Sequence, residues 1–159
     1  MDNIKLDRTD LAILATLQTD GHISNTDLAE RANLSPSACL RRVQRLEETG
    51  VIAGYIALVD PLRVGLGLQA FVRVQLARHD AEAIAGFSKR VNDWDEVVAC
   101  HALTGDMDYL LQVIVRDLDH FSRFLLDHLL SGSFVADVNS SFVLRTVKQT
   151  RRLALGHLA

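Results

Sequence analysis

Residues 24–46 read SNTDLAERANLSPSACLRRVQRL, and this stretch decides the fold of the N-terminal half. Two serines, Ser24 and Ser35, each precede a helical pattern in the position of an N-cap residue. Pro36 follows Ser35 at the first helical position, where a missing N–H costs nothing. Only the short Asn33–Leu34 segment separates the two predicted helices, so the stretch predicts a helix-turn-helix.

A further helix is predicted before this pair. Asp7 is in position to cap it, Leu11 and Leu14 fall on its apolar face, and Gly21 is expected to end it. Gly50 closes the third helix. Residues 51–59 then combine β-branched and aromatic side chains around a glycine, which predicts a short strand or hairpin, the wing of a winged helix.

The third helix carries two chemically distinct faces. One face is apolar and is expected to pack on the first two helices, while arginines at helical spacing occupy the other face. Guanidinium groups bind phosphates and guanine edges, and hydroxyl groups at a helix N-terminus suit a phosphate. The alternative is a solvated face of mixed charge. The candidate DNA-binding residues are Ser35, Ser37, Arg41, Arg42 and Arg45.

Pro61, Gly65 and Gly67 mark residues 60–67 as a linker between domains at 1–59 and 68–159. After the linker, strands and helices alternate. Strands are predicted at 68–77, 97–103 and 109–115, with one or two more at 138–147, and Asp80 and Asp119 are expected to cap the intervening helices. The order is βαββαβ, so the predicted class is α+β: a winged helix-turn-helix followed by a ferredoxin-like sandwich.

Composition restricts the function classes. The chain has 159 residues, 48% of them hydrophobic, and a formal net charge of −3, which argues against coating nucleic acid by bulk electrostatics. No targeting segment and no apolar run of the ~20 residues of a membrane helix is apparent, so we expect a cytoplasmic protein. Cys39 and Cys100 lack zinc-site spacing, and no catalytic motif, metal site or cofactor fingerprint is found.

The sequence resembles the Lrp/AsnC (leucine-responsive/asparagine-responsive) family of transcription regulators. The resemblance rests on residues 6–21, 24–29 and 34–47, on LTGDMDYLL at 103–111, and on SSFVL at 140–144. It implies a winged helix-turn-helix joined to a ferredoxin-like domain that dimerises through its sheet. It also implies that dimers join into rings of four, an octamer, with amino acids bound between dimers.

The loop at 104–109 is the candidate effector site. From the residues alone it reads as a hairpin turn, because Gly and Asp suit tight turns. A free amino acid, however, needs an anionic acceptor for its ammonium group and hydrogen-bond donors for its carboxylate. The family resemblance places this loop and the last strand at the effector pocket, with Asp108 as the ammonium contact. The candidate effector-binding residues are Gly105, Asp106, Asp108, Tyr109, Val138 and Ser140.

The predicted function is therefore that of a sequence-specific, DNA-binding transcription regulator that responds to a small effector, an amino acid, and not that of an enzyme. Its expected partners are double-stranded DNA, the effector and further copies of the chain. Two alternatives stay open. One is a small ferredoxin-like amino-acid-binding subunit or enzyme, and the other is a nucleoid-type architectural protein without an effector. The arginines of the third helix argue against the first alternative.

Overall fold

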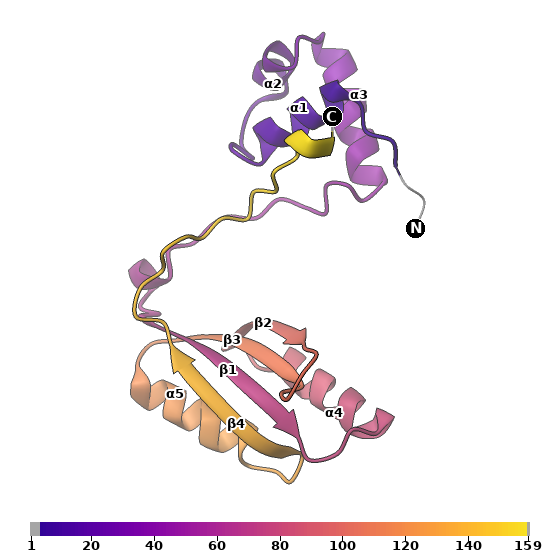
Figure 1. Ribbon diagram of the computed structural model, residues 1–159. Coiled ribbons are helices and arrows are strands. Elements are labelled where there is room, and N and C mark those ends of the chain that lie inside the picture. The colour runs from indigo at the N-terminus through magenta and orange to yellow at the C-terminus, as the bar shows by residue number, and fades with distance from the viewer. Residues whose placement is uncertain (1–3, 159) are drawn as a thin grey trace. The chain divides into compact units, whose positions relative to one another are not determined.

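A computed structural model describes residues 4–158 of the chain (Figure 1). It divides the chain into two compact units. One unit contains the chain up to Ala57 together with the tail from Lys148 onward, and the other spans Leu58–Val147. The division differs from the predicted domains, which assigned the tail to the second half. The tail groups with the helices because Leu155 packs against their hydrophobic core.

The first unit contains, among the described residues, the α-helices α1 (Arg8–Leu17), α2 (Asn25–Arg31) and α3 (Pro36–Glu48), and a short 3-10 helix, η3 (Gly156–Leu158), in the tail. Each α-helix begins where the sequence predicted. Asp7, Ser24 and Ser35 all have extended backbones, and their side chains accept hydrogen bonds from the backbone N–H groups of Asp10, Asp27 and Ala38. These caps satisfy N–H groups that have no partner within the helix, and thereby fix the three helix starts.

The helical unit has its own core. Ile13, Cys39 and Leu46 are fully buried, and the other members are Leu14, Leu28 and Ala29. Burial raises the pKa of the Cys39 thiol and keeps it in its neutral form, as expected of a small buried hydrophobe. Asn33 takes a left-handed conformation (φ 54°) in the turn between α2 and α3, and Gly50 (φ 72°) ends α3.

The predicted wing strand is not present. Residues 51–60 form neither helix nor strand, and no β-ladder partner pairs with them within the described part of the chain. They are held by single contacts instead: the Ile52 N–H donates to the Leu46 carbonyl, and the Tyr55 hydroxyl donates to Glu47 Oε1 at 2.9 Å. These residues have side chains that favour a strand, but without a neighbouring strand to pair with they form an irregular segment.

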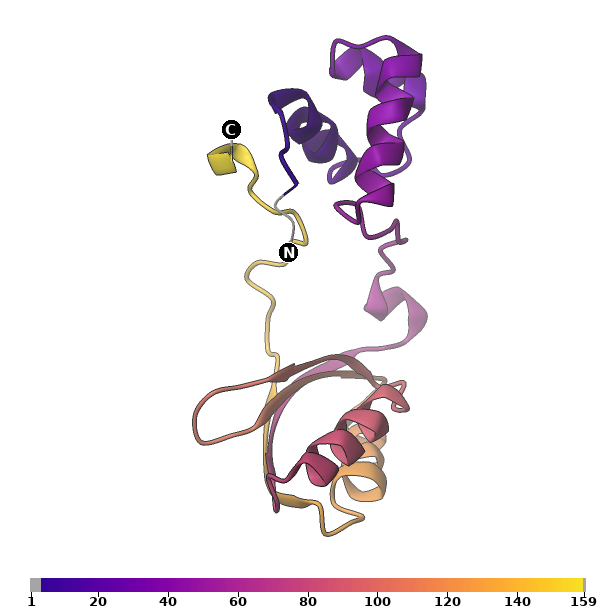
Figure 2. The ribbon, with the colours of Figure 1, turned by 90° about the vertical axis from the view of Figure 1, so that its right-hand side faces the viewer.

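The second unit is the predicted ferredoxin-like sandwich. Its elements are β1 (Leu68–Leu76), α4 (Ala81–Asn92), β2 (Val97–Ala102), β3 (Tyr109–Val115), α5 (Leu118–Phe124) and β4 (Val135–Phe142). A π-helical turn at Leu125–Leu129 extends α5. The sheet is antiparallel with the order β2-β3-β1-β4, and Figure 2 shows both helices on one face of it.

Alternation along β1 separates the two faces of the sheet. Ala70, Val72, Val74 and Leu76 are buried under the helices, where Phe87 and Trp94 complete the core. Phe71 and Arg73 point to the opposite face and are exposed. The apolar alternation thus places one row of β1 in the core and leaves the other on the uncovered face.

Two local predictions in this unit were wrong. Asp117, not Asp119, caps α5: its side chain accepts the N–H of His120, because the helix begins one residue after it. The last strand runs from Val135 to Phe142 instead of through 138–147. Its register with β1 ends where Ala70 meets Phe142, and one further hydrogen bond joins the Val143 N–H to the Gln69 carbonyl. Beyond Val143 no strand pairs with the tail within the described residues.

The linker contains a short 3-10 helix, η1 (Pro61–Val64), which is capped by Asp60. No helix within residues 4–158 is both long enough and apolar enough to cross a membrane.

Candidate DNA-binding surface and effector site

Helix α3 and its N-cap residue together contain all the predicted DNA-binding residues. Ser35 caps the helix, and its hydroxyl lies 3.3 Å from that of Ser37. The side chains of Arg41, Arg42 and Arg45 line one hollow of about 440 Å³ together with Ala38, Leu34 and Asp7. The structure therefore brings the three arginines to a single surface, on the side of α3 opposite the buried Cys39 and Leu46.

Two of these arginines are not free. Arg42 Nη1 lies 2.7 Å from Asp7 Oδ2 and 2.8 Å from Asp10 Oδ1, and Arg45 Nη2 forms an ion pair with Asp10 Oδ2. These contacts tie the first turn of α1 to the middle of α3. The predicted arginine face therefore carries two guanidinium groups that are already paired with carboxylates, which the sequence did not indicate.

The pairing shifts the pKa values of its members. The pKa of Asp7 is lowered, first by the hydrogen bond from the Asp10 N–H and then by Arg42. The pKa of Arg42 is raised by its hydrogen bonds to Asp7 and Asp10. Each shift favours the charged form, so Asp7 and Arg42 form an ion pair at neutral pH.

Arg41 differs from its two neighbours. It is exposed, and no carboxylate lies within ion-pair distance of it in the part of the chain that the structure describes. Sequence reasoning missed Asp7 and Asp10 as members of this surface. The available signal was Asp10 itself, an acidic residue directly before the apolar positions of α1, where burial of its carboxylate requires a cationic partner.

The predicted effector residues gather at one end of the sheet. Val74 of β1 pairs with Tyr109 of β3 on one side and with Val138 of β4 on the other. Ser140 of β4 pairs with Val72, two residues before Val74 in β1. The loop with Gly105 and Asp106 joins β2 to β3 at the same end, and Gly105 has a φ of 116°, which favours glycine.

Asp108 already has partners within the chain. Its Oδ2 accepts the N–H of Leu76 at 2.7 Å, and His79 Nε2 lies 3.0 Å from both carboxylate oxygens. Asp108 therefore fixes the end of β1 to the β2–β3 loop. It is only partly exposed, with 24% of its side chain accessible.

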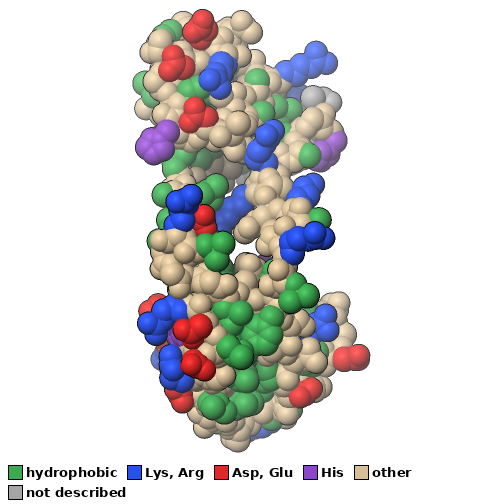
Figure 3. Space-filling view, turned by 90° about the vertical axis from the view of Figure 1, so that its left-hand side faces the viewer, with side chains coloured by type: hydrophobic (Ala, Val, Ile, Leu, Met, Phe, Trp, Pro, Cys, Tyr) green, Lys and Arg blue, Asp and Glu red, His purple; other side chains and the backbone are tan. Residues whose placement is uncertain are grey.

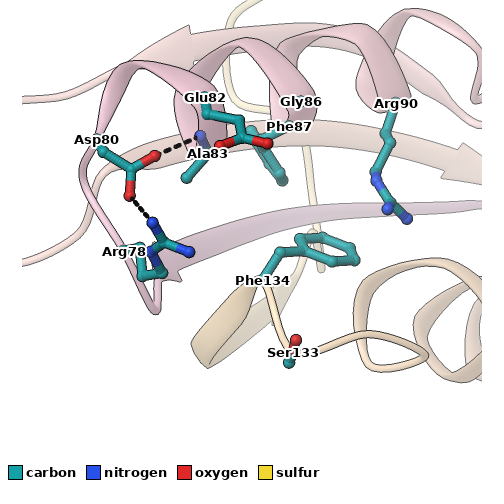
Figure 4. Close-up of a pocket in the computed structure, with 9 residues that line it drawn as sticks. All are labelled: Arg78, Asp80, Glu82, Ala83, Gly86, Phe87, Arg90, Ser133 and Phe134. Atoms are coloured by element: carbon teal, nitrogen blue, oxygen red, sulfur yellow. Dashed lines mark hydrogen bonds and ion pairs between the residues drawn. The ribbon is translucent and has the colours of Figure 1, made fainter.

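A cavity of about 280 Å³ lies beside this end of the sheet (Figure 4). It is next to the predicted effector residues, because the ring of Phe87 in its wall lies 4.6 Å from that of Tyr109. Arg90 lies over the ring of Phe134 at 4.4 Å, and Arg78 pairs with Asp80 at 2.8 Å. None of the six predicted residues lines the cavity; its walls come from Arg78, Asp80, Glu82, Ala83, Gly86, Phe87, Arg90, Ser133 and Phe134.

Each half of the chain matches the model of a known protein family. Residues 6–53 match the model of a winged helix-turn-helix DNA-binding domain, and residues 69–153 match that of the Lrp/AsnC ligand binding domain. These matches and the fold define a DNA-binding transcription regulator with an appended ligand-binding domain. The chain belongs to the Lrp/AsnC family.

Relatives match along nearly the whole chain. The leucine-responsive regulatory protein of Escherichia coli K12 is 41% identical over 150 residues, which cover 94% of this chain and 92% of that protein. The transcriptional regulator AzlB of Bacillus subtilis is 37% identical over 147 residues, 92% of this chain and 94% of AzlB. A transcriptional regulator from Neisseria meningitidis, solved as a complex with L-Met, has a TM-score of 0.94 and 49% identity and covers 98% of this chain and 100% of its own.

Proposed function

We propose that the protein binds specific operator sequences through α3 and that an amino acid modulates this binding. The observation that carries the DNA-binding part is the exposed Arg41 beside Arg42 and Arg45 on the second helix of a helix-turn-helix. Arg41 has no ion-pair partner among residues 4–158. Such a helix enters the major groove, where arginine donates two hydrogen bonds to a guanine. Ser35 and Ser37 at its N-terminus supply donors for a phosphate.

The proposed effector site is the end of the sheet that carries Asp108 and Tyr109. The adjoining cavity adds both charges that a free amino acid requires. Glu82 is an acceptor for an ammonium group, and Arg90 is a donor for a carboxylate. Phe87 and Phe134 add apolar surface for a side chain of the effector, and a relative that is 49% identical was solved with L-Met. These observations favour an apolar or sulfur-containing amino acid.

We further propose that the protein is a homo-oligomer, at least a dimer and as a full assembly an octamer. The helices cover only one face of the sheet (Figure 2), and Phe71 on the other face is 37% exposed. Hydrophobic side chains also gather at the surface of the sheet unit, the body at the bottom of Figure 3. One helix-turn-helix reads only a half-site, so a two-fold dimer suits operator recognition. A cytoplasmic location accords with access to DNA.

Neither alternative function gains support of its own. Within the described residues no group of three or more His, Cys, Asp or Glu side chains could hold a metal ion. An enzyme or a binding subunit has no use for the arginines of α3. An architectural protein has no use for a charged cavity beside the sheet. We therefore propose a regulator without enzymatic activity.

Two measurements test the proposal. Arg41→Ala should weaken binding to an operator selected from random duplexes by about 1–3 kcal/mol if Arg41 reads a guanine. A thermal-shift screen of the twenty amino acids tests the sensing: a ligand at ~100 times its Kd adds roughly 2.7 kcal/mol. Unchanged operator affinity would overturn the DNA-contact assignment, and the absence of stabilisation by any amino acid would overturn the sensing assignment.

A further inference from the structure

Asp10 is the one charged side chain that is fully buried among residues 4–158. Burial of a carboxylate is costly unless cations and hydrogen bonds compensate the charge. Both Asp10 oxygens are compensated: Oδ1 by Arg42, and Oδ2 by Arg45 and by the N–H of Asp7 at 3.1 Å. The buried carboxylate thus lies directly behind the proposed DNA-binding surface, in contact with two of its three arginines.

Asp7 completes the cluster from the solvent side. Its Oδ1 accepts the N–H of Asp10 at 2.8 Å, and its Oδ2 accepts Arg42 Nη1 at 2.7 Å. The side chain of Asp7 is 54% exposed, whereas that of Arg42 is 32% exposed. Arg42 is therefore held between one buried and one exposed carboxylate, in a fixed position at the rim of the hollow on α3.

This arrangement lowers the positive charge of the proposed DNA-binding surface. Three arginines and two aspartates leave a formal charge of only +1 on the surface. Sequence-independent DNA affinity arises from cations that neutralise phosphates, whereas selectivity arises from side chains that are correctly placed at base edges. Arginines that are paired with carboxylates contribute little to sequence-independent affinity. Their fixed geometry, however, favours selectivity.

We propose that Asp7 and Asp10 are positioning residues that set the DNA selectivity of the protein. They hold Arg42 and Arg45 in place and cancel most of their charge, so that affinity for arbitrary DNA stays low while operator recognition is preserved. The inference rests on the proposed role of α3 in DNA binding. It assigns a function in recognition to Asp10 of α1 and to Asp7, the N-cap residue of that helix, both outside the recognition helix itself.

Asp7→Asn tests this role. Asparagine caps a helix as well as aspartate does, so the start of α1 is retained while the charge is lost. Arg42 keeps its ion pair with Asp10, but the formal charge of the surface rises from +1 to +2. The added positive charge can neutralise a phosphate, which steepens the dependence of log K on log salt by about 0.9. Affinity for an unrelated duplex should rise about 8-fold at 0.1 M salt, with a smaller gain for the selected operator. The ratio of the two affinities should therefore fall.

Asp60→Asn is the matched control. Asp60 also caps a helix, its side chain is 51% exposed, and it pairs with Arg63 at 3.5 Å. The substitution makes the same change in net charge outside the helical unit, and it should leave the salt slope and both affinities unchanged. Asp10→Asn, checked for folding by circular dichroism, should lower the selectivity ratio further, because Arg45 loses its carboxylate partner and Arg42 loses one of two.

A loss of packing alone would weaken binding to both duplexes, so the expected gain for the unrelated duplex separates positioning from a structural defect. The inference is overturned if Asp7→Asn leaves the unrelated duplex bound as in the wild type, or bound more weakly, or if Asp60→Asn gives the same gain. Failure of the wild-type protein to prefer its selected operator would instead overturn the proposed function, and this inference with it.

Discussion

The side-chain amide of Gln18 makes two hydrogen bonds to the backbone of Leu153. The Leu153 N–H donates to Gln18 Oε1 at 2.6 Å, and Gln18 Nε2 donates to the Leu153 carbonyl at 3.2 Å. A glutamine at the end of α1 thereby holds the C-terminal tail as a neighbouring strand would hold it. Leu153 and Leu155 line a hollow of about 400 Å³ with Leu14 and Leu17 of the same helix.

Removal of this clamp should destabilise the helical unit. Gln18→Ala is expected to lower the free energy of unfolding by about 1–2 kcal/mol, because each exposed hydrogen bond contributes roughly 0.5–1.5 kcal/mol. Truncation after Val147 should cost more, since it also uncovers the apolar residues of α1. Denaturant unfolding followed by circular dichroism measures both effects, with the exposed helical Gln44→Ala as control. Equal stability of Gln18→Ala and the control would contradict the clamp.

Arg45→Ala should differ from Arg41→Ala in its effect on folding. Arg45 pairs with the buried Asp10, and its loss leaves one carboxylate oxygen without its cation. We expect a decrease in the free energy of unfolding of about 1–3 kcal/mol for Arg45→Ala, and almost none for Arg41→Ala. Urea titrations of the two variants in the absence of DNA provide the measurement. Similar stabilities of both variants would show that the ion pair contributes little.

Tyr55 should make stability fall at high pH. Partial burial and the hydrogen bond to Glu47 raise the pKa of Tyr55 to about 12, against an ordinary value of about 10. The folded state therefore holds this proton more tightly than the unfolded chain does. The resulting stabilisation is complete below pH 10 and is lost as the pH rises towards 12. Tyr55→Phe should show a shallower decrease in the free energy of unfolding over this range; parallel curves would contradict it.

Asp108 has a structural role that can be separated from sensing. Asp108→Ala leaves the N–H of Leu76 without its acceptor and should cost about 1–3 kcal/mol of stability. Asp108→Asn retains an acceptor oxygen but loses the charge, so its stability should be closer to that of the wild type. If Asp108 accepts the effector's ammonium group, the asparagine variant should fold yet lose the thermal shift with amino acids. A full shift in this variant would leave Asp108 as a turn residue only.

Phe71 provides a test of assembly through the uncovered face of the sheet. Replacement of this residue by aspartate places a charge at the proposed interface, where burial without a cationic partner is unfavourable. Light scattering should show a wild-type protein of at least dimeric mass and a Phe71→Asp variant of smaller mass. A wild-type mass near the 17.6 kDa of one chain would contradict the proposed dimer.

Features encoded within a few residues were predictable from the sequence. The caps at Asp7, Ser24 and Ser35 and the bounds of β3 follow from local hydrogen bonding and from strict alternation. The cap of α5 was predicted wrongly as Asp119 instead of Asp117. Both residues are of a type that caps helices, and the backbone geometry decides between them.

Features that depend on distant partners were not predictable in this way. The ion pairs between α1 and α3 join residues 32 and 35 positions apart, and the clamp on the tail joins residues 135 positions apart. Strand propensity also could not reveal that residues 51–59 and 144–147 have no neighbouring strand in the described part of the chain. These ion pairs, the clamp and the missing strand partners all depend on the three-dimensional arrangement. None of them leaves a periodic pattern in the sequence.

The membership of the tail in the helical unit has a consequence for synthesis. The helices that carry the DNA-binding residues leave the ribosome before the sheet unit, but the segment from Lys148 onward, which adds Leu155 to their core, leaves it after that unit. The sheet unit lies entirely between these two pieces and can close while the helical unit is still unfinished. The helical unit therefore reaches its full stability only after the sheet unit has been synthesised, and a ribosome that stops before Lys148 releases a chain whose helices lack the packing of Leu155.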